Sequence, residues 1–184
     1  MDQAAHMNAP LSQPLIRLLL WIGVLSLLVR TWIGATFPIT GDEAYFYWWG
    51  VYPDWGYYDH PPMAGWAIAA MVKLFGDTTF AMRIPALLLP TALGAALWWG
   101  FSSVDREKTA WAIVLFWLTP INWLNALITT DTPLIFWSVL SISTLVRAEQ
   151  RARQDRSTYA LHALSGLFLG LAFLSKYFAV VIGL

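Results

Sequence analysis

The stretch Leu15–Thr36 reads LIRLLLWIGVLSLLVRTWIGAT and is apolar almost throughout. A helix needs about 20 mostly apolar residues to cross a hydrocarbon layer of roughly 30 Å. Charges occur only near the two ends, at Arg17 and Arg30, whose long side chains can reach the membrane interface. The bulky residues after Arg30 differ from the small residues of a signal-peptide cleavage site. We therefore predict an uncleaved membrane span.

The composition of the whole chain agrees with a membrane protein. Of its 184 residues 58% are hydrophobic and 12% are charged, against about 25% charged residues in a typical soluble domain. The 16% of aromatic residues excludes a disordered chain. Equal numbers of basic and acidic residues, 11 of each, give no net basic charge that would favour nucleic acid as a partner. The chain has no cysteine, which excludes disulfides and thiolate metal sites.

Four further apolar stretches are predicted membrane spans: Thr78–Phe101, Thr109–Ile128, Pro133–Val146 and Tyr159–Ser175. At 14 residues Pro133–Val146 is short for a span, and the alternatives are that it begins in a re-entrant or partly extended stretch or that it extends back to Thr129. Pro120 is expected to break the second of these stretches. The apolar run Phe178–Leu184 is too short to cross, and it predicts that the chain continues into a further span and is incomplete at its C-terminus. The predicted fold class is an all-α integral membrane protein. It has about five transmembrane helices and two interfacial helices in a long first external loop.

The basic residues predict the orientation. Four arginines lie in the short connection between Arg147 and Arg156, and Arg106 and Lys108 lie in another connection. Counting spans places both connections and the N-terminus on one side, which the positive-inside rule assigns to the cytoplasm. We therefore expect a cytoplasmic N-terminus at residues 1–14, a transmembrane module at 15–184, and an external loop at 37–77. The chain is expected in the plasma membrane, the inner membrane of the cell, as a multi-pass protein.

The external loop at 37–77 is predicted to form two short helices. Thr40 and Glu43 have the spacing of a capping box before the aromatic run AYFYWWG. A second helix, MAGWAIAAMVKLFG, is expected to begin at Pro62 and is too short to span. Asp77 is predicted to cap the span that follows.

Ionisable residues gather on the predicted external side, where such groups are costly and usually paired or functional. They are Asp42, Glu43, Asp59, His60, Arg83, Asp131 and Lys176. Their convergence on one side of the membrane predicts a chemical site there.

Most of these residues also have a purely structural interpretation. Asp42 can simply favour the helix dipole. Glu43 can simply close the capping box, His60 can belong to a turn, and Lys176 can reach the interface. Asp131 can stand at a helix start at which Thr132 is the cap. A residue such as Arg83, one turn into its span, can either reach the interface or face a buried anion.

Four motifs in order resemble one family: TGDEAYFYWWG, YYDHPPMAGW with KLFGDTTFAMRIPALLL, ALITTDTPLIFWSVL and GLFLGLAFLSKY. They are similar to the polytopic glycosyltransferases of the C superfamily (GT-C). The branch is that of the protein O-mannosyltransferases and the bacterial lipid A aminoarabinose transferases, which is glycosyltransferase family 39-like. The resemblance covers the chain from about Thr40 to Tyr177. It implies transfer of a sugar from a polyprenyl-phosphate-linked donor to a lipid, glycan or protein acceptor on the external face.

The resemblance also implies roles for residues. Asp42 matches the acidic residue of the first external loop that acts as base. Asp59 and His60 occupy the place of a Glu-Lys pair that in relatives contacts metal and carrier phosphate. The third position after Asp42 is often arginine in the aminoarabinose branch and is Tyr45 here, so that sugar is not assigned.

The chemistry of sugar transfer is consistent with these residue types. A carboxylate can activate the acceptor hydroxyl, and Asp42, Glu43 and Asp131 are the predicted catalytic residues. Cations stabilise the departing phosphate, and His60, Arg83 and Lys176 are the predicted donor phosphate-binding residues. Asp59 and Glu43 are the candidate ligands of a divalent metal ion, the one cofactor considered. One-step displacement would invert the anomeric centre. The expected partners are the lipid-linked donor and membrane lipids; the sugar and the acceptor are not predicted.

Two other functions are alternatives to sugar transfer. A non-enzymatic protein that binds or translocates polyprenyl-phosphate lipids would keep the same fold without transfer. A small transporter could use Asp131 and Lys176 as an intramembrane relay, but the charges cluster at one face and do not line a path across the bilayer.

Overall fold

The computed structural model describes residues 10–153 and 155–183, with the backbone alone at residue 124. The described residues form helices joined by short connections, and they contain no strand. The elements are α2 (Gln13–Thr36), α3 (Gly41–Val51), α4 (Met63–Phe75), α5 (Thr79–Phe101), α6 (Arg106–Leu118), α7 (Pro120–Leu124), α8 (Asp131–Glu149), α9 (Arg156–Ser175) and the 3₁₀ segment η1 (Tyr177–Ile182). The predicted all-α fold class is confirmed.

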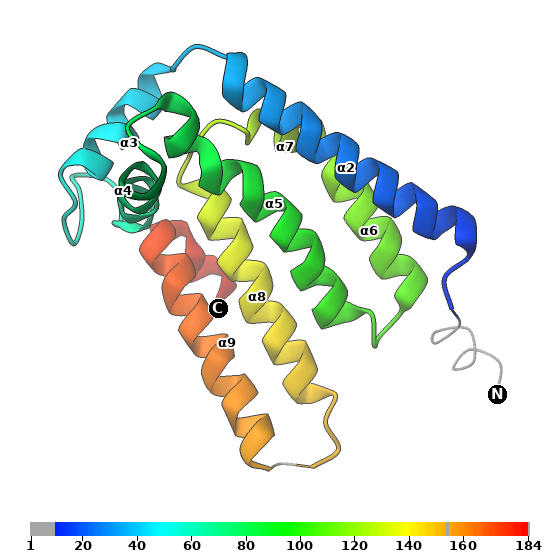
Figure 1. Cartoon of the computed structure of the whole chain (residues 1–184). Coiled ribbons are helices and arrows are strands. Elements are labelled where there is room, and N and C mark those ends of the chain that lie inside the picture. Colours follow the sequence, from blue (N-terminus) through cyan, green and yellow to red (C-terminus); the bar gives the residue numbers. More distant parts are fainter. Residues whose placement is uncertain (1–9, 154, 184) are drawn as a thin grey trace.

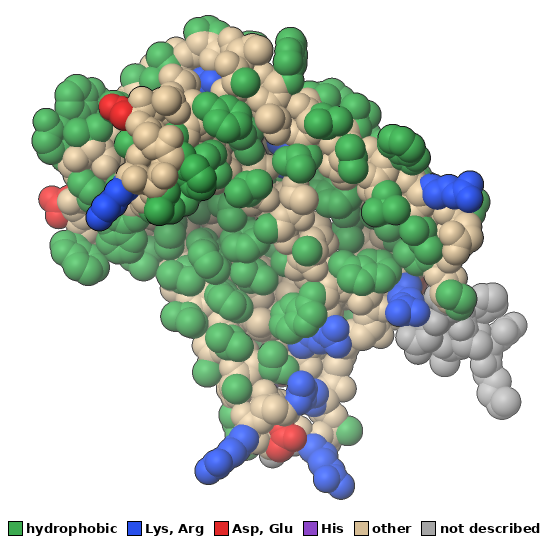
Figure 2. Space-filling view, viewed as in Figure 1, with side chains coloured by type: hydrophobic (Ala, Val, Ile, Leu, Met, Phe, Trp, Pro, Cys, Tyr) green, Lys and Arg blue, Asp and Glu red, His purple; other side chains and the backbone are tan. Residues whose placement is uncertain are grey.

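The long helices form a bundle, and the two helices of the first loop lie at one end of it (Figure 1). α8 packs between α5 and α9, α2 packs against α5 and α6, and α4 joins α3 to α5. Figure 2 shows hydrophobic side chains over much of the visible face. Most of its Lys and Arg side chains lie toward the end of the bundle that is opposite α3 and α4, where the α8–α9 connection lies. This distribution is that of a multi-pass membrane protein.

Three helices in the described chain are long and apolar enough to cross a membrane: α2, α5 and α9. The predicted third span is divided in the structure, because α6 ends at Leu118 and α7 begins at Pro120, which lacks a backbone N–H. α8 has 19 residues and extends beyond the predicted Pro133–Val146 at both ends. It runs beside the spanning helices, but it is less apolar than they are.

Small polar residues explain the lower hydropathy of α8. The hydroxyl of Ser143 donates to the Ala96 carbonyl of α5 at 3.2 Å, and a Cβ on Gly100 would lie 2.4 Å from the Cβ of Ser143. On the other side of α8, Ser141 and Ser165 each donate to the other's carbonyl oxygen at 2.9 Å. Membrane helices pack closely through such small residues. The buried face of α8 is therefore polar in composition although it makes helix contacts.

Side-chain caps mark the starts of α3, α5, α6 and α9. The predicted capping box of α3 is present, with Thr40 and Glu43 satisfying each other's backbone N–H groups. α4 begins at Met63, so Pro62 is the cap residue and not the first helical residue as predicted. The cap of α5 is Thr78, whose hydroxyl accepts from the Ala81 N–H at 3.1 Å. The prediction that Asp77 is this cap was wrong.

Two further details differ from the sequence predictions. α8 begins at Asp131 after Thr130, so Thr132 lies inside the first turn and is not the cap. Arg30 does not reach the interface: it is fully buried, and it donates to the Ser26 carbonyl at 3.1 Å and to the Thr91 hydroxyl at 2.8 Å. Residues 1–9 of the predicted cytoplasmic N-terminus, and the last residue of the predicted module, lie outside the described residues.

Close packing of α3 on α4 holds the first loop in place. A Cβ on Gly50 would lie 2.4 Å from the side chain of Ile68, and one on Gly65 would lie 2.6 Å from the Tyr57 hydroxyl and 2.9 Å from the Cβ of Trp49. Glycine is therefore needed at both positions for the helices to approach this closely. The aromatic helix α3 is thereby fixed at the end of α5, where the ionisable residues lie.

Candidate functional site

A buried ion pair joins α3 to α5. Arg83 Nη2 and Nε lie 2.6 Å and 2.7 Å from the two carboxylate oxygens of Glu43. The side chains are 0% and 1% exposed. Such a bidentate pair has the planar geometry that arginine and carboxylate share.

All five N–H donors of Arg83 are used within the protein. Besides bonding Glu43, they donate to the backbone carbonyl oxygens of Gly34, Phe37 and Pro38 at 2.8–3.0 Å. The Glu43 carboxylate also accepts from the backbone N–H groups of Thr40 and Ile128. The pair thus ties the end of α2, the start of α3, α5 and the segment before α8 together. Of the two sequence interpretations of Arg83, facing a buried anion is the one the structure shows.

The surroundings of Glu43 favour its charged form. Burial alone raises the pKa of a carboxyl group, but the hydrogen bonds from Arg83 and Thr40 outweigh it, and the pKa of Glu43 lies below its ordinary value. Glu43 is therefore a carboxylate at neutral pH, and it holds the cation of Arg83 in place.

Asp42 differs from its neighbour. It lies in the first turn of α3 and is exposed. It takes part in none of the side-chain hydrogen bonds or ion pairs described for the chain, whereas the other external acidic residues each have a partner. The helix N-terminus favours a negative charge at this position. Asp42 is thus a carboxylate directed away from the packed core.

Asp59 and His60 follow α3 at the same end of the bundle. Asp59 Oδ1 accepts a hydrogen bond from the Tyr45 hydroxyl at 3.3 Å and lies 3.1 Å from Nδ1 of His60. The contact with His60 holds the pKa of Asp59 below its ordinary value. The His60 ring packs against Phe46 and Trp49. His60 is therefore anchored in the aromatic cluster of α3, with Asp59 beside it.

A second ion pair lies between α8 and the end of α9. Lys176 Nζ lies 2.7 Å from Asp131 Oδ1, and the two side chains are 33% and 49% exposed. Asp131 is the first residue of α8, and Lys176 follows the last residue of α9. The sequence placed both residues on the external side, and the structure brings them into contact.

Several contacts of this region were missed by the sequence analysis. The Tyr47 hydroxyl donates to both oxygens of Asp77, at 2.8 Å and 2.9 Å, and Tyr45 contacts Asp59. Both tyrosines belong to AYFYWWG, which the sequence analysis read only as an interfacial aromatic stretch. The partners of Tyr45 and Tyr47 lie 14 and 30 residues further along the chain, so no local spacing indicated these contacts.

The described side chains do not form a metal cage by themselves. No group of three or more His, Asp or Glu side chains within residues 10–153 and 155–183 has the spacing of a metal site. Both oxygens of Glu43 are already engaged by Arg83, and Asp59 with His60 supplies two groups. Metal dependence stays a prediction.

Known proteins resemble this chain in sequence and in fold. The lipid A galacturonosyltransferase RgtD of Rhizobium johnstonii is 30% identical over 139 residues, which are 74% of this chain and 28% of the relative. The structure of the S. cerevisiae protein O-mannosyltransferase Pmt1-Pmt2 complex bound to the sugar donor matches with a TM-score of 0.74. The match has 18% identity and covers 99% of this chain and 28% of that chain. This second likeness shows the fold. The chain spans little more than a quarter of the length of either protein.

The chain also matches the model of a protein family. The family described as dolichyl-phosphate-mannose-protein mannosyltransferase matches residues 59–184, which is more than half of the chain. The matched part contains Asp59, His60, Arg83, Asp131 and Lys176, and it begins after α3. The resemblance to GT-C glycosyltransferases of the family 39-like branch is confirmed. The chain belongs to the dolichyl-phosphate-mannose-protein mannosyltransferase family.

Proposed function

We propose that this chain is the part of a membrane glycosyltransferase that carries the catalytic base and the donor phosphate site. The enzyme moves a sugar from a polyprenyl-phosphate-linked donor to a lipid, glycan or protein acceptor on the extracytoplasmic face. The proposal rests on family membership, on the GT-C fold, and on the ionisable residues gathered at one end of the bundle.

One observation carries the proposal: Asp42 is exposed and unpaired next to a neighbour that is buried and fully paired. The Glu43–Arg83 pair fixes the start of α3, so the position of Asp42 is defined although its carboxylate contacts no described partner. A general base needs both properties, because it must reach the acceptor proton and must not be occupied by a cation.

The proposed reaction is a single displacement at the anomeric carbon of the donor sugar. The Asp42 carboxylate takes the proton of the acceptor hydroxyl, and the acceptor oxygen forms a bond to the anomeric carbon. The bond from that carbon to the phosphate oxygen breaks, and polyprenyl phosphate leaves with the electron pair. Fixed cations lower the energy of the departing charge. Lys176, held by Asp131, supplies a fixed positive charge, and His60, beside Asp59, supplies a ring N–H as hydrogen-bond donor.

Arg83 and Glu43 act indirectly in this scheme, through the position of α3. All five donors of Arg83 are engaged, so the pair positions α3 and, through it, Asp42. No step is assigned to a metal ion. Because Glu43 and Asp131 are each paired with a cation, Asp42 is the one free carboxylate among the external acidic side chains described, and single displacement with inversion at the anomeric carbon follows.

The test uses purified full-length protein in lipid nanodiscs and a panel of radiolabelled polyprenyl-phosphate sugars. Label is followed into protein, glycan and lipid fractions. The variant is Asp42→Asn, and the matched control is Asp54→Asn, an exposed aspartate of the same external segment. We expect Asp42→Asn to lower turnover by about 10²–10⁴-fold with donor binding retained, while Asp54→Asn keeps the wild-type rate.

Three outcomes would contradict the proposal. Absence of transfer from every donor, with donor lipid still bound, would favour the non-enzymatic lipid-binding or translocating protein. Equal losses in the two aspartate variants would remove Asp42 as base. Retention of configuration in the product, read from its anomeric coupling by NMR, would exclude single displacement.

A further inference from the structure

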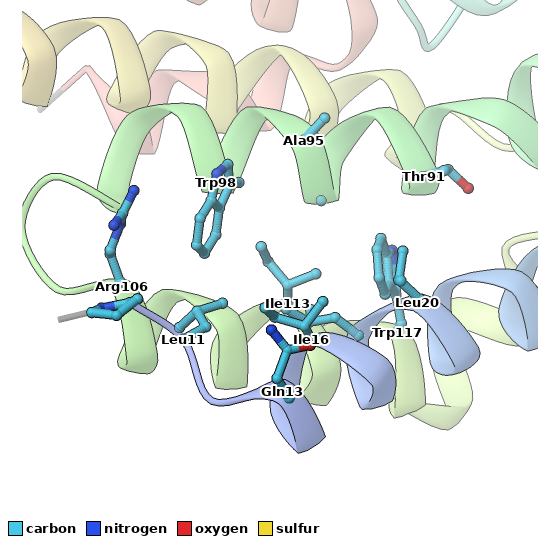
Figure 3. Close-up of a pocket in the computed structure, with 13 residues that line it drawn as sticks. Leu11, Gln13, Ile16, Leu20, Thr91, Ala95, Trp98, Arg106, Ile113 and Trp117 are labelled. Carbon is cyan, nitrogen blue, oxygen red and sulfur yellow. The ribbon is translucent and has the colours of Figure 1, made fainter. Parts of the chain in front are cut away.

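A groove of about 660 Å³ lies between α2, α5 and α6 (Figure 3). It lies toward the end of the bundle that carries the α5–α6 connection, away from α3 and α4 (Figure 1). Most of its lining is apolar, with Ile16 and Leu20 of α2, Ala95 of α5 and Ile113 of α6 facing the space. The proposed transfer reaction uses none of these residues.

The wall of the groove is rigidly built around Trp117. The indole Nε1 donates to the Pro90 carbonyl oxygen at 3.0 Å. A Cβ on Gly94 would lie 2.4 Å from the Trp117 ring, and a Cβ on Gly23 would lie 2.9 Å from it. The Trp117 ring therefore fits between α2 and α5 because the residues that face it, Gly23 and Gly94, have no side chain. A groove held in this way exists before any ligand enters it.

The groove has one charged end. Figure 3 shows Arg106 and Trp98 at one end and Thr91 at the other. Arg106 takes part in none of the ion pairs described for the chain, and the nearby Asp105 pairs with Lys108 at 3.1 Å. Arg17, four residues after the groove residue Gln13, is exposed at the same end of α2. Tryptophan and arginine together are typical of the headgroup level of a membrane.

We infer that this groove binds an anionic phospholipid from the leaflet next to the basic connections. One acyl chain lies along the apolar wall between α2 and α6, and the phosphate lies beside Arg106. The volume is within the range of sites for small ligands, about 300–1,000 Å³. Basic pockets between membrane helices on this side of a bilayer recognise anionic headgroups. The inference does not depend on the proposed transfer reaction.

The test measures lipid retention by native mass spectrometry. Full-length protein in detergent is incubated with phosphatidylglycerol or with phosphatidylcholine of the same acyl chains. Arg106→Ala removes the charge, and Ala95→Trp fills the groove from an exposed position of α5. The matched control is Arg153→Ala, which removes one exposed arginine from the other basic connection.

We expect wild-type protein to retain phosphatidylglycerol in preference to phosphatidylcholine. Arg106→Ala should lower that preference about fivefold, the factor that one basic residue contributes near an anionic surface. Arg153→Ala should leave it unchanged, and Ala95→Trp should abolish retention of both lipids. Ala95→Phe, with a smaller ring, serves as a second groove-filling variant, and the thermal midpoint of each variant shows that it is folded.

The alternatives give different results. Equal loss in the two arginine variants would show diffuse attraction by the basic surface and no site. Retention unaffected by Ala95→Trp and Ala95→Phe would place the lipid elsewhere. Absence of both lipids from wild-type protein would show that another part of the protein covers the groove. Each of these results would overturn the inference.

Discussion

Two ion pairs at the same end of the bundle have opposite characters. Glu43 and Arg83 are fully buried, and every guanidinium donor is engaged by the protein. Asp131 and Lys176 are joined at a similar distance, 2.7 Å, but both remain substantially exposed. Separating a buried pair leaves an uncompensated charge, whereas an exposed pair exchanges readily for water or for a ligand. The first pair is thus suited to hold the site together, and the second is suited to take part in it.

The largest effect is expected from Glu43→Gln. The substitution leaves the Arg83 cation buried without a counter-charge, which typically costs about 3–5 kcal/mol of unfolding free energy. Chemical denaturation of the protein in nanodiscs measures it. Asp42→Asn, one residue earlier and exposed, is the matched control and should change stability by less than about 0.5 kcal/mol. The double variant Glu43→Gln/Arg83→Met removes both charges and should recover part of the loss. A single variant as stable as the control would contradict the structural role of the pair.

Lys176→Gln is expected to affect catalysis and to leave the fold nearly unchanged. Removing a cation that stabilises a departing phosphate should lower turnover about 100-fold, as for other electrostatic catalytic groups. The readout is transfer from the donor identified in the panel, with kcat and KM measured separately. Lys73→Gln, which changes an exposed lysine at the end of α4, is the control. Wild-type turnover in Lys176→Gln would remove this pair from the site.

The capping box shows which parts of this site the sequence could predict. Thr40 and Glu43 are three residues apart, so their mutual hydrogen bonds depend on helix geometry alone. The partner of Arg83 is 40 residues away in the chain. That pairing depends on how α3 packs against α5, and the sequence therefore left both alternatives for Arg83 open.

The same distinction explains the errors. Position near a span end suggested that Arg30 reaches the interface, but the Thr91 hydroxyl of α5 and the packing of α2 bury it. The predicted span Pro133–Val146 stopped short of the ends of α8 because Asp131 and Arg147 bound the apolar stretch, whereas the helix includes both charged residues. Hydropathy indicates which stretches are apolar, and it does not indicate which helix faces pack through small polar residues.

Acid should weaken the buried Glu43–Arg83 pair. The folded pKa of Glu43 lies below the ordinary value of 4.5, so between the two values the unfolded chain binds more protons than the folded chain. The stability that Glu43 contributes is therefore fully present above about pH 4.5 and is lost as the pH falls through the lowered pKa. We expect the difference in thermal midpoint between wild type and Glu43→Gln to shrink from pH 6 to pH 3. A difference that stays constant over this range would contradict the charged state assigned to Glu43.

The smallest effect is expected from Asp131→Asn on stability. Because the two side chains are 49% and 33% exposed, solvent already competes for both charges, and such pairs contribute about 0.2–1 kcal/mol. Asparagine keeps the size of the side chain and removes only the charge. Denaturation under the conditions used for Glu43→Gln measures the loss. A cost equal to that of Glu43→Gln would show that the Asp131–Lys176 pair also holds the bundle together. A small cost combined with reduced turnover would show that the ion pair positions Lys176 for the donor phosphate and contributes little to the fold.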